Sequence, residues 1–110
     1  MKFFRTAPRD DEVEPAEANA RQAEGAVLID VREPGEWKRG HAVGALHIPL
    51  GNLAGRLSEL PEGELLFVCQ SGGRSSDATA LARSRGFDAR NVRGGMQSWA
   101  RTGLPTEKSA

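Results

Sequence analysis

The fold of this chain is decided by one stretch of its sequence, Leu65-Leu66-Phe67-Val68-Cys69-Gln70-Ser71-Gly72-Gly73-Arg74-Ser75. The apolar residues that lead to Cys69, the only cysteine, predict a short β-strand covered on both faces. The two glycines that follow tolerate backbone angles that other residues resist, which indicates a tight loop. Ser75 is predicted to be the N-cap of a helix that runs to Arg85.

A strand, a tight loop and a helix in this order predict a ring of backbone N–H groups. The N–H groups of the loop and of the first helical turn point toward a common centre, where they bind anions and favour a thiolate over a thiol. Cys69, at the end of the strand, is therefore the candidate nucleophile. The residues expected to line its ring are Gln70, Ser71, Gly72, Gly73, Arg74 and Ser75.

Strand and helix patterns alternate on both sides of this unit. Further strands are predicted at residues 26–29, 45–48 and 87–92. Helices are predicted at residues 15–24, 34–39 and 52–60, with a last helix after the glycines at 94 and 95. Helix 34–39 is expected to bury Trp37. The alternation predicts an α/β fold, a central parallel sheet with helices on both faces, in which Cys69 lies at the carboxyl end of a strand, where such sheets place their ligand sites.

The length of 110 residues fits a single domain. This domain is predicted to span residues 13–105. Residues 1–12 mix charge and proline without periodicity, so they are expected to be an N-terminal extension or a short edge strand. Residues 106–110 are expected to form a C-terminal tail.

Composition limits the partners of the chain. Fifteen basic and fifteen acidic side chains cancel, so the charge favours neither a nucleic-acid nor a membrane partner, and a preference for anions must be local. No apolar run is long enough to span a membrane, and charge and proline interrupt the first residues before a signal peptide could form. One cysteine excludes an intramolecular disulfide and fits a reducing compartment, so a soluble cytoplasmic protein is expected.

Three segments of the chain resemble the rhodanese-like domain family. The loop has the pattern Cys69-x-x-Gly72-x-Arg74-Ser75, which is typical of that family. The family's first and last signatures are similar to residues 28–49, with Gly40-His41 inside them, and to residues 86–99. These segments occur in the family's order and together cover roughly residues 13–105. The chain is therefore identified as a rhodanese-like domain of the single-domain thiosulfate sulfurtransferase type.

This resemblance implies a reaction. Cys69 would take the outer sulfur of a donor such as thiosulfate, become a persulfide, and pass that sulfur to cyanide or a thiol. The implied partners are thus a small anionic sulfur donor and a small acceptor, with a protein persulfide donor or acceptor as a further possibility. No cofactor is implied, and two histidines with one cysteine at these spacings do not resemble a metal site.

Each residue around the loop has an expected role. Loop amides would stabilise the thiolate and the persulfide, and Arg74 would dock the anionic donor through its several N–H groups, although a structural ion pair is its alternative role. Asp30, Arg32 and Glu33 are expected to form an ion-pair and hydrogen-bond group that braces the loop. His41 is expected to be a hydrogen-bonded strut rather than an acid or base.

Two other functions compete with the thiosulfate sulfurtransferase. A sulfur-relay or persulfide-binding module would exchange sulfur with a protein partner. A phosphatase or arsenate reductase is disfavoured by the resemblance, because Cys69 and Arg74 are separated by four residues, whereas the related phosphatase and arsenate-reductase loops are longer. A shorter ring fits one sulfur atom better than a tetrahedral phosphate.

Overall fold

The computed structural model describes residues 10–108. Its strands are β1 (Glu12–Val13), β2 (Val27–Asp30), β3 (His41–Ala42), β4 (Leu46–His47), β5 (Glu64–Val68), β6 (Asp88–Val92) and β7 (Thr106–Glu107). Its α-helices are α1 (Pro15–Ala23), α2 (Pro34–Arg39), α3 (Leu50–Leu53), α4 (Gly73–Ser84) and α5 (Gly95–Arg101), and a 3₁₀-helix, η1 (Ala54–Glu59), follows α3. The alternation that the sequence predicts is therefore present.

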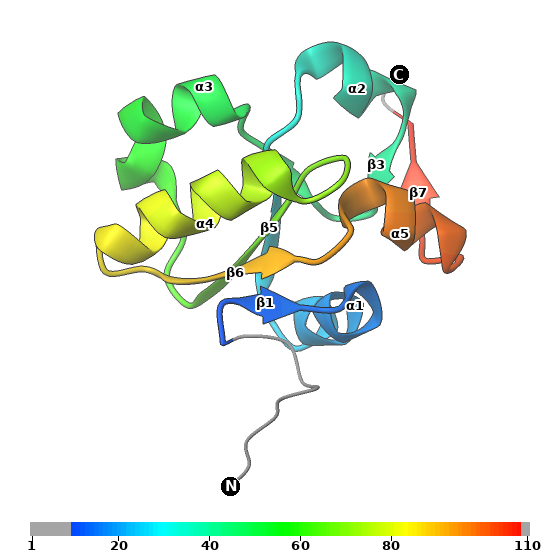
Figure 1. Ribbon diagram of the computed structural model, residues 1–110, viewed down its shortest axis with the longest axis horizontal. Coiled ribbons are helices and arrows are strands. Elements are labelled where there is room, and N and C mark those ends of the chain that lie inside the picture. Colours follow the sequence, from blue (N-terminus) through cyan, green and yellow to red (C-terminus); the bar gives the residue numbers. More distant parts are fainter. Residues whose placement is uncertain (1–9, 109–110) are drawn as a thin grey trace, which may run out of the picture.

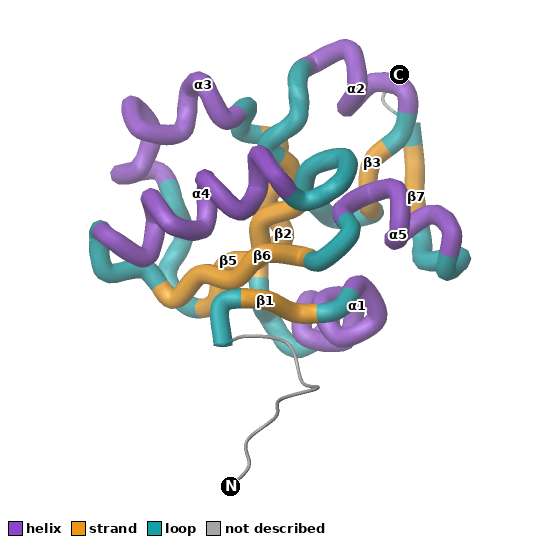
Figure 2. Tube along the Cα trace, viewed as in Figure 1, coloured by secondary structure: helices purple, strands orange, loops and turns teal. Residues whose placement is uncertain are grey.

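Five strands form one parallel sheet in the order β1-β6-β5-β2-β4. Strand β5 lies in the middle, and its last residue, Val68, is in register with Asp30 at the end of β2. The carboxyl ends of these neighbouring strands thus meet at one edge of the sheet, where Cys69 follows β5. Figure 2 shows the strands between helices that lie on either side of them.

Side chains of alternate residues pack on opposite faces of the sheet. In β5, Leu65 and Phe67 belong to one core and Leu66 and Val68 to the other. Residues from α3 and α4 complete the first core, and residues from α1 and α5 complete the second. Figure 1 shows α3 and α4 on one side of the strands and α1 and α5 on the other. The predicted parallel sheet with helices on both faces is confirmed.

The single helix predicted at residues 52–60 is wrong. A short α3 begins earlier, at Leu50, and gives way to η1, inside which Arg56 has non-helical angles (φ −123°, ψ 18°). Two glycines in this segment, Gly51 and Gly55, raise the entropic cost of a regular helix, so packing of leucines on the core decides the local shape.

The predicted start of the loop helix is also wrong. Helix α4 begins at Gly73, and its N-cap is Gly72, whose φ of +121° favours glycine. The chain therefore turns into the helix before it reaches Ser75, which lies inside the first helical turn. Its buried hydroxyl group is free to face the sulfur instead of capping the helix.

Short strands fix both ends of the described chain to the domain. Strand β1 pairs with β6 at the edge of the main sheet. Strand β7, which falls in the segment expected to be a tail, pairs with β3 in an antiparallel two-stranded sheet. The part of the expected N-terminal extension before residue 10 lies outside the described residues.

The helices in residues 10–108 are short. The longest, α4, has 12 residues, whereas a membrane span needs about 20 apolar residues. Among the described residues, no helix has the length and apolar character to cross a membrane.

Candidate active site

The thiol of Cys69 lies at the carboxyl end of the central strand, and the residue is only 1% exposed. Its Sγ accepts the N–H of Gly72 at 3.1 Å and the hydroxyl of Ser75 at 3.2 Å. Burial raises the pKa of Cys69, but hydrogen bonds from the Ser75 hydroxyl and from the amides of Ser75, Gly72 and Ser71 outweigh burial. The net pKa lies below the ordinary value of a cysteine, so the ring favours the thiolate.

Helix α5 positions the Cys69 loop through two backbone hydrogen bonds. The N–H of Met96 donates to the carbonyl of Cys69 at 2.7 Å, and the N–H of Gln97 donates to the carbonyl of Gln70 at 3.0 Å. Because these carbonyls point toward α5, the peptide N–H groups that follow them can point inward. Gly95 permits this approach: its φ is +60°, and a Cβ there would lie 2.4 Å from the Cys69 carbonyl oxygen.

Arg74 projects from the first turn of α4 toward α2. Its Nη1 and Nη2 donate to the two carboxylate oxygens of Glu36 at 2.7 and 2.9 Å. This contact to Arg74 is the main reason that the pKa of Glu36 falls to about 2. The Glu36 carboxylate in turn raises the pKa of the Arg74 guanidinium. Arg74 therefore has a protein partner that the loop sequence alone did not reveal.

Asp30 and Arg32 form a buried ion pair beside the loop. The Arg32 Nη2 lies 2.9 Å from Asp30 Oδ2, and the side chains are 5% and 0% exposed. The same guanidinium donates to the Gly40 carbonyl at 2.6 Å and to Gln70 Oε1 at 3.3 Å. It thus links the ends of β2 and α2 to the Cys69 loop.

Glu33 and His41 lie elsewhere. The carboxylate of Glu33 caps α2 instead of joining the buried pair. His41 stacks on Trp37 with a ring-centroid distance of 3.5 Å, and its Nδ1 hydrogen-bonds to the Trp37 carbonyl at 2.8 Å. Within the described residues, no hydrogen bond joins His41 to residues 69–75.

The expected burial of Trp37 is wrong. No residue of α2 is fully buried. The indole of Trp37 stacks on both His41 and His47, with centroid distances of 3.5 and 4.7 Å. Trp37 is half-buried, and the contacts with these two imidazoles shield part of the ring without inserting it into the core.

A comparison with models of protein families identifies the family of this chain. The model of the rhodanese-like domain matches residues 14–102. The chain belongs to the rhodanese-like domain family. The resemblance stated from the loop and its flanking segments is thereby confirmed.

Several known proteins are similar to this rhodanese-like domain. A sulfurtransferase of Allochromatium vinosum is 38% identical over 84 residues, which cover 74% of this chain and 78% of that protein. Thiosulfate sulfurtransferase GlpE of Pseudomonas fluorescens is 34% identical over 101 residues, which cover 89% and 91%. The putative sulfur carrier protein YrkF of Bacillus subtilis is 40% identical over 74 residues, which cover 66% of this chain and 40% of that protein.

Solved structures agree with this assignment. A rhodanese-related protein from Thermoplasma volcanium has a TM-score of 0.83 and 26% sequence identity, and the match covers 89% of this chain and 98% of that chain. The protein is therefore a member of a family of sulfurtransferases.

Asn91 is a residue of this rhodanese-like domain that sequence reasoning missed. It lies on β6, is 6% exposed, and its Oδ1 accepts the Ser75 hydroxyl at 2.5 Å. Its Nδ2 donates to the Gly72 carbonyl at 3.3 Å. An asparagine near the end of a predicted strand was the available signal, but the contact depends on β6 lying beside β5.

Two hollows border the outer face of the loop. One, of about 290 Å³, is lined by Arg32, Glu36, Arg39, Gly40 and Gln70. The other, of about 260 Å³, shares four of these residues and adds Met96, Ala100 and Thr106. Arg39 lines both hollows and has no ion pair among the described residues.

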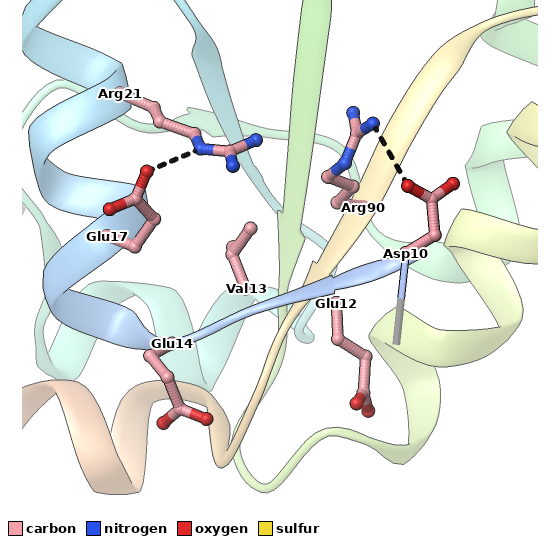
Figure 3. Close-up of a pocket in the computed structure, with 7 residues that line it drawn as sticks. All are labelled: Asp10, Glu12, Val13, Glu14, Glu17, Arg21 and Arg90. Carbon is pink, nitrogen blue, oxygen red and sulfur yellow. Dashed lines mark hydrogen bonds and ion pairs between the residues drawn. The ribbon is translucent and has the colours of Figure 1, made fainter. Parts of the chain in front are cut away.

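A larger hollow, of about 400 Å³, contains no residue of the Cys69 loop. Figure 3 shows it between β1, α1 and β6, where Arg21 pairs with Glu17 and Arg90 with Asp10. Both of its arginines, Arg21 and Arg90, pair with carboxylates of the same hollow, and the residues that line it include no thiol. In residues 10–108, no group of three or more His, Cys, Asp or Glu side chains is placed to hold a metal ion.

Proposed function

We propose that this rhodanese-like domain transfers the outer sulfur of an anionic donor such as thiosulfate to cyanide or a thiol through a persulfide on Cys69. The observation that carries the proposal is the environment of Sγ: a buried sulfur that accepts both a loop N–H and a hydroxyl, with a lowered pKa. Its similarity to GlpE supports thiosulfate as the donor.

The first half-reaction forms one sulfur–sulfur bond and breaks another. The Cys69 thiolate attacks the outer sulfur of thiosulfate, the bond between the two donor sulfurs breaks, and sulfite leaves with the electron pair. Cys69 then carries a persulfide anion. In the second half-reaction, cyanide or a thiolate attacks the terminal sulfur and regenerates the Cys69 thiolate. Neither step needs an external oxidant or reductant.

The loop groups would act on the sulfur that carries the charge. The N–H of Gly72 already donates to Sγ, and the N–H groups of Gln70, Ser71, Gly73, Arg74 and Ser75 belong to the same predicted ring. Preorganised donors of this kind stabilise charge that develops during transfer. Asp30 and Arg32 would keep the ring in place through Gln70, and His41 would support α2 at a greater distance.

Donor docking by Arg74 remains part of the proposal. A guanidinium has five N–H donors, and two of its nitrogens already donate to Glu36, so further N–H groups remain for an anion. Arg39, in both hollows beside Gln70, is a second cation on the same side of the loop.

The test is to replace Cys69 with serine and to measure thiocyanate formation from thiosulfate and cyanide. Serine is nearly isosteric but forms no stable persulfide, so we expect turnover to disappear while the melting temperature changes little. Mass spectrometry of the wild-type protein after thiosulfate should show the addition of one sulfur atom that a reductant removes. Turnover retained by Cys69→Ser, or Cys69-dependent hydrolysis of an aryl phosphate by the wild type, would overturn the proposal.

A sulfur-relay function is the second candidate. The outer residues of the loop, Gln70, Ser71 and Gly73, are exposed, so a partner thiol can approach the loop. Similarity to the putative sulfur carrier YrkF supports this candidate. It predicts slow turnover with thiosulfate and fast sulfur transfer to or from a protein persulfide. In either case the Cys69 thiol must be available between turnovers, and we propose a cytoplasmic location because a reducing compartment keeps a free thiol available.

A further inference from the structure

The hydroxyl group of Ser75 lies within hydrogen-bond distance of three acceptors. Its Oγ is 2.5 Å from Asn91 Oδ1, 3.2 Å from Cys69 Sγ and 3.3 Å from the Gly72 carbonyl oxygen, which also accepts from Asn91 Nδ2. Ser75 is fully buried, and Cys69 and Asn91 are almost so. A hydroxyl group has one hydrogen and donates to one acceptor at a time. Cys69 Sγ and Asn91 Oδ1 therefore cannot both receive the Ser75 proton at the same moment.

The side chain of Asn91 is oriented by the loop. Its Nδ2 donates to the Gly72 carbonyl at 3.3 Å. If the amide turned over, Oδ1 would face that carbonyl oxygen, and two acceptors would meet without a hydrogen between them. Oδ1 therefore faces Ser75, where it can only accept a hydrogen bond.

The two charge states of Cys69 use this arrangement differently. When Cys69 is a thiol, its S–H can donate to Ser75 Oγ, and the Ser75 hydroxyl can donate to Asn91 Oδ1, so every buried group has a partner. When the proton leaves to solvent, Sγ needs donors and Ser75 turns toward it. Asn91 Oδ1 then loses its donor in a buried site, which costs free energy.

We propose that Asn91 is a positioning residue that competes with Cys69 for the hydroxyl proton of Ser75 and thereby limits the fraction of thiolate. This inference rests on the proposed function, because it concerns the same nucleophile. The benefit is reactivity: a thiolate becomes less nucleophilic as the pKa of its thiol falls, and the best attacking thiol has a pKa near the ambient pH. Asn91 opposes the excess stabilisation that the loop amides and Ser75 would otherwise give.

The charged groups near Cys69 act independently of the hydrogen bonds between Ser75 and Asn91. Arg74, from α4, interacts electrostatically with Cys69, and Glu36, from α2, partly neutralises that arginine. Asp30 and Arg32, after β2, pair with each other. None of these groups hydrogen-bonds to Ser75 or Asn91. Neutral substitutions of Ser75 and Asn91 therefore test the competition with the charges unchanged.

The experiment measures the rate of alkylation of Cys69 by iodoacetamide from about pH 5 to about pH 10, which gives the apparent pKa of the thiol. In Asn91→Leu, Ser75 keeps its proton for Sγ, so we expect the pKa to fall by about half a unit to one unit. In Ser75→Ala, Sγ loses a donor, and we expect the pKa to rise by a similar amount. A purely structural role of Asn91 predicts the opposite sign for Asn91→Leu, because the loosened ring would hold the thiolate less well.

A double variant shows whether Asn91 acts through Ser75. If it does, Ser75→Ala with Asn91→Leu has the same pKa as Ser75→Ala alone. Thr79→Val is the matched control: Thr79 is buried on the same helix, and its hydroxyl donates at 2.8 Å to the backbone carbonyl of Ser75, not to the sulfur. Its alkylation profile should equal that of the wild type.

A pKa of Asn91→Leu equal to or above that of the wild type would overturn the inference, as would a shift that persists without the Ser75 hydroxyl. Thermal unfolding checks that each variant is folded, and Asn91→Val, whose β-branched side chain suits β6, replaces a leucine variant that fails to fold. Alkylation needs no sulfur donor. A wild-type protein that does not use thiosulfate would therefore contradict only the proposed function. A rise of the Cys69 pKa in Asn91→Leu would contradict only this inference.

Discussion

The Cys69 loop and the hollow in Figure 3 both gather polar groups, but they do so in different ways. Around Cys69, the sulfur is held by uncharged donors, and Ser75 and Asn91 are buried. In the hollow beside β1 and α1, Arg21 pairs with Glu17 and Arg90 pairs with Asp10, and the two carboxylates are 55% and 82% exposed to water. In the hollow, water and salt screen the charged pairs. Around Cys69, a few buried hydrogen-bond donors hold the sulfur, and water cannot replace them.

This difference predicts where the protein is sensitive to substitution. Removing one partner of an exposed pair leaves the other in water, at little cost. Removing one group from the buried ring leaves another group without a partner. Substitutions of similar chemical size should therefore differ strongly in effect between the two regions.

Gly95→Ala should have the largest effect on stability. A Cβ at this position would lie 2.4 to 2.6 Å from backbone atoms of Cys69 and Gln70, and φ is +60°. We expect a loss of about 2–4 kcal/mol in the free energy of unfolding and loss of activity, because the loop must move away from α5. Urea unfolding and the thiocyanate assay measure both.

Gly103→Ala is the control for this prediction. Its φ is also positive, +76°, but a Cβ there meets no atom within 4 Å. It should cost only about 1 kcal/mol and leave turnover unchanged. Equal effects of the two substitutions would show that backbone angle, and not the contact between α5 and the loop, explains the sensitivity.

In the Cys69 region, Arg74→Lys tests whether Arg74 docks the anionic donor. Lysine keeps the charge but cannot hold Glu36 with two nitrogens and still present a planar set of donors to an anion. We expect kcat/KM for thiosulfate to fall about tenfold, mainly through KM, with a smaller change in kcat/KM for cyanide. Kinetics equal to those of the wild type would remove the docking role.

Glu36 should make the stability of the site depend on pH. Its pKa is about 2 in the folded protein, against 4.5 for the free side chain. The folded state therefore binds fewer protons than the unfolded state between these values, and the contribution of Glu36 is present above about pH 4.5 and is lost as the pH falls toward 2.

The variant Glu36→Gln checks this expectation by urea unfolding at several pH values. The wild type should be the more stable protein at neutral pH, and the difference should shrink between about pH 4.5 and about pH 2. A stability difference that does not change with pH would show that the ion pair with Arg74 does not carry it.

Glu17→Gln, in the Figure 3 hollow, should have the smallest effect. Its carboxylate pairs with Arg21 within α1, and Arg21 also contacts Glu64. We expect the free energy of unfolding to change by less than about 0.5 kcal/mol. Thiocyanate formation should be unchanged. A clear loss of activity would mean that this hollow communicates with Cys69.

Local sequence patterns determined much of this protein. The apolar run before Cys69 and the glycines after it predicted the strand, the loop and the nucleophile candidate, because strand burial and backbone freedom depend on residues close in the chain. The alternation of strands and helices predicted the parallel sheet. The bounds of α3, η1 and α4 were less predictable, because packing and one positive φ at Gly72 outweighed helix propensity and the preference of serine for N-caps.

Only the tertiary structure decided which distant residues complete the ring. Glu36 meets Arg74 across 38 positions of sequence, Asn91 reaches Ser75 from a neighbouring strand, and Gly95 brings α5 against the Cys69 carbonyl. No local pattern marks these contacts, because they depend on the order of the strands and on the faces that the helices cover. The sequence places the sulfur at the end of a strand, and the packing of three other segments around it decides which groups surround it.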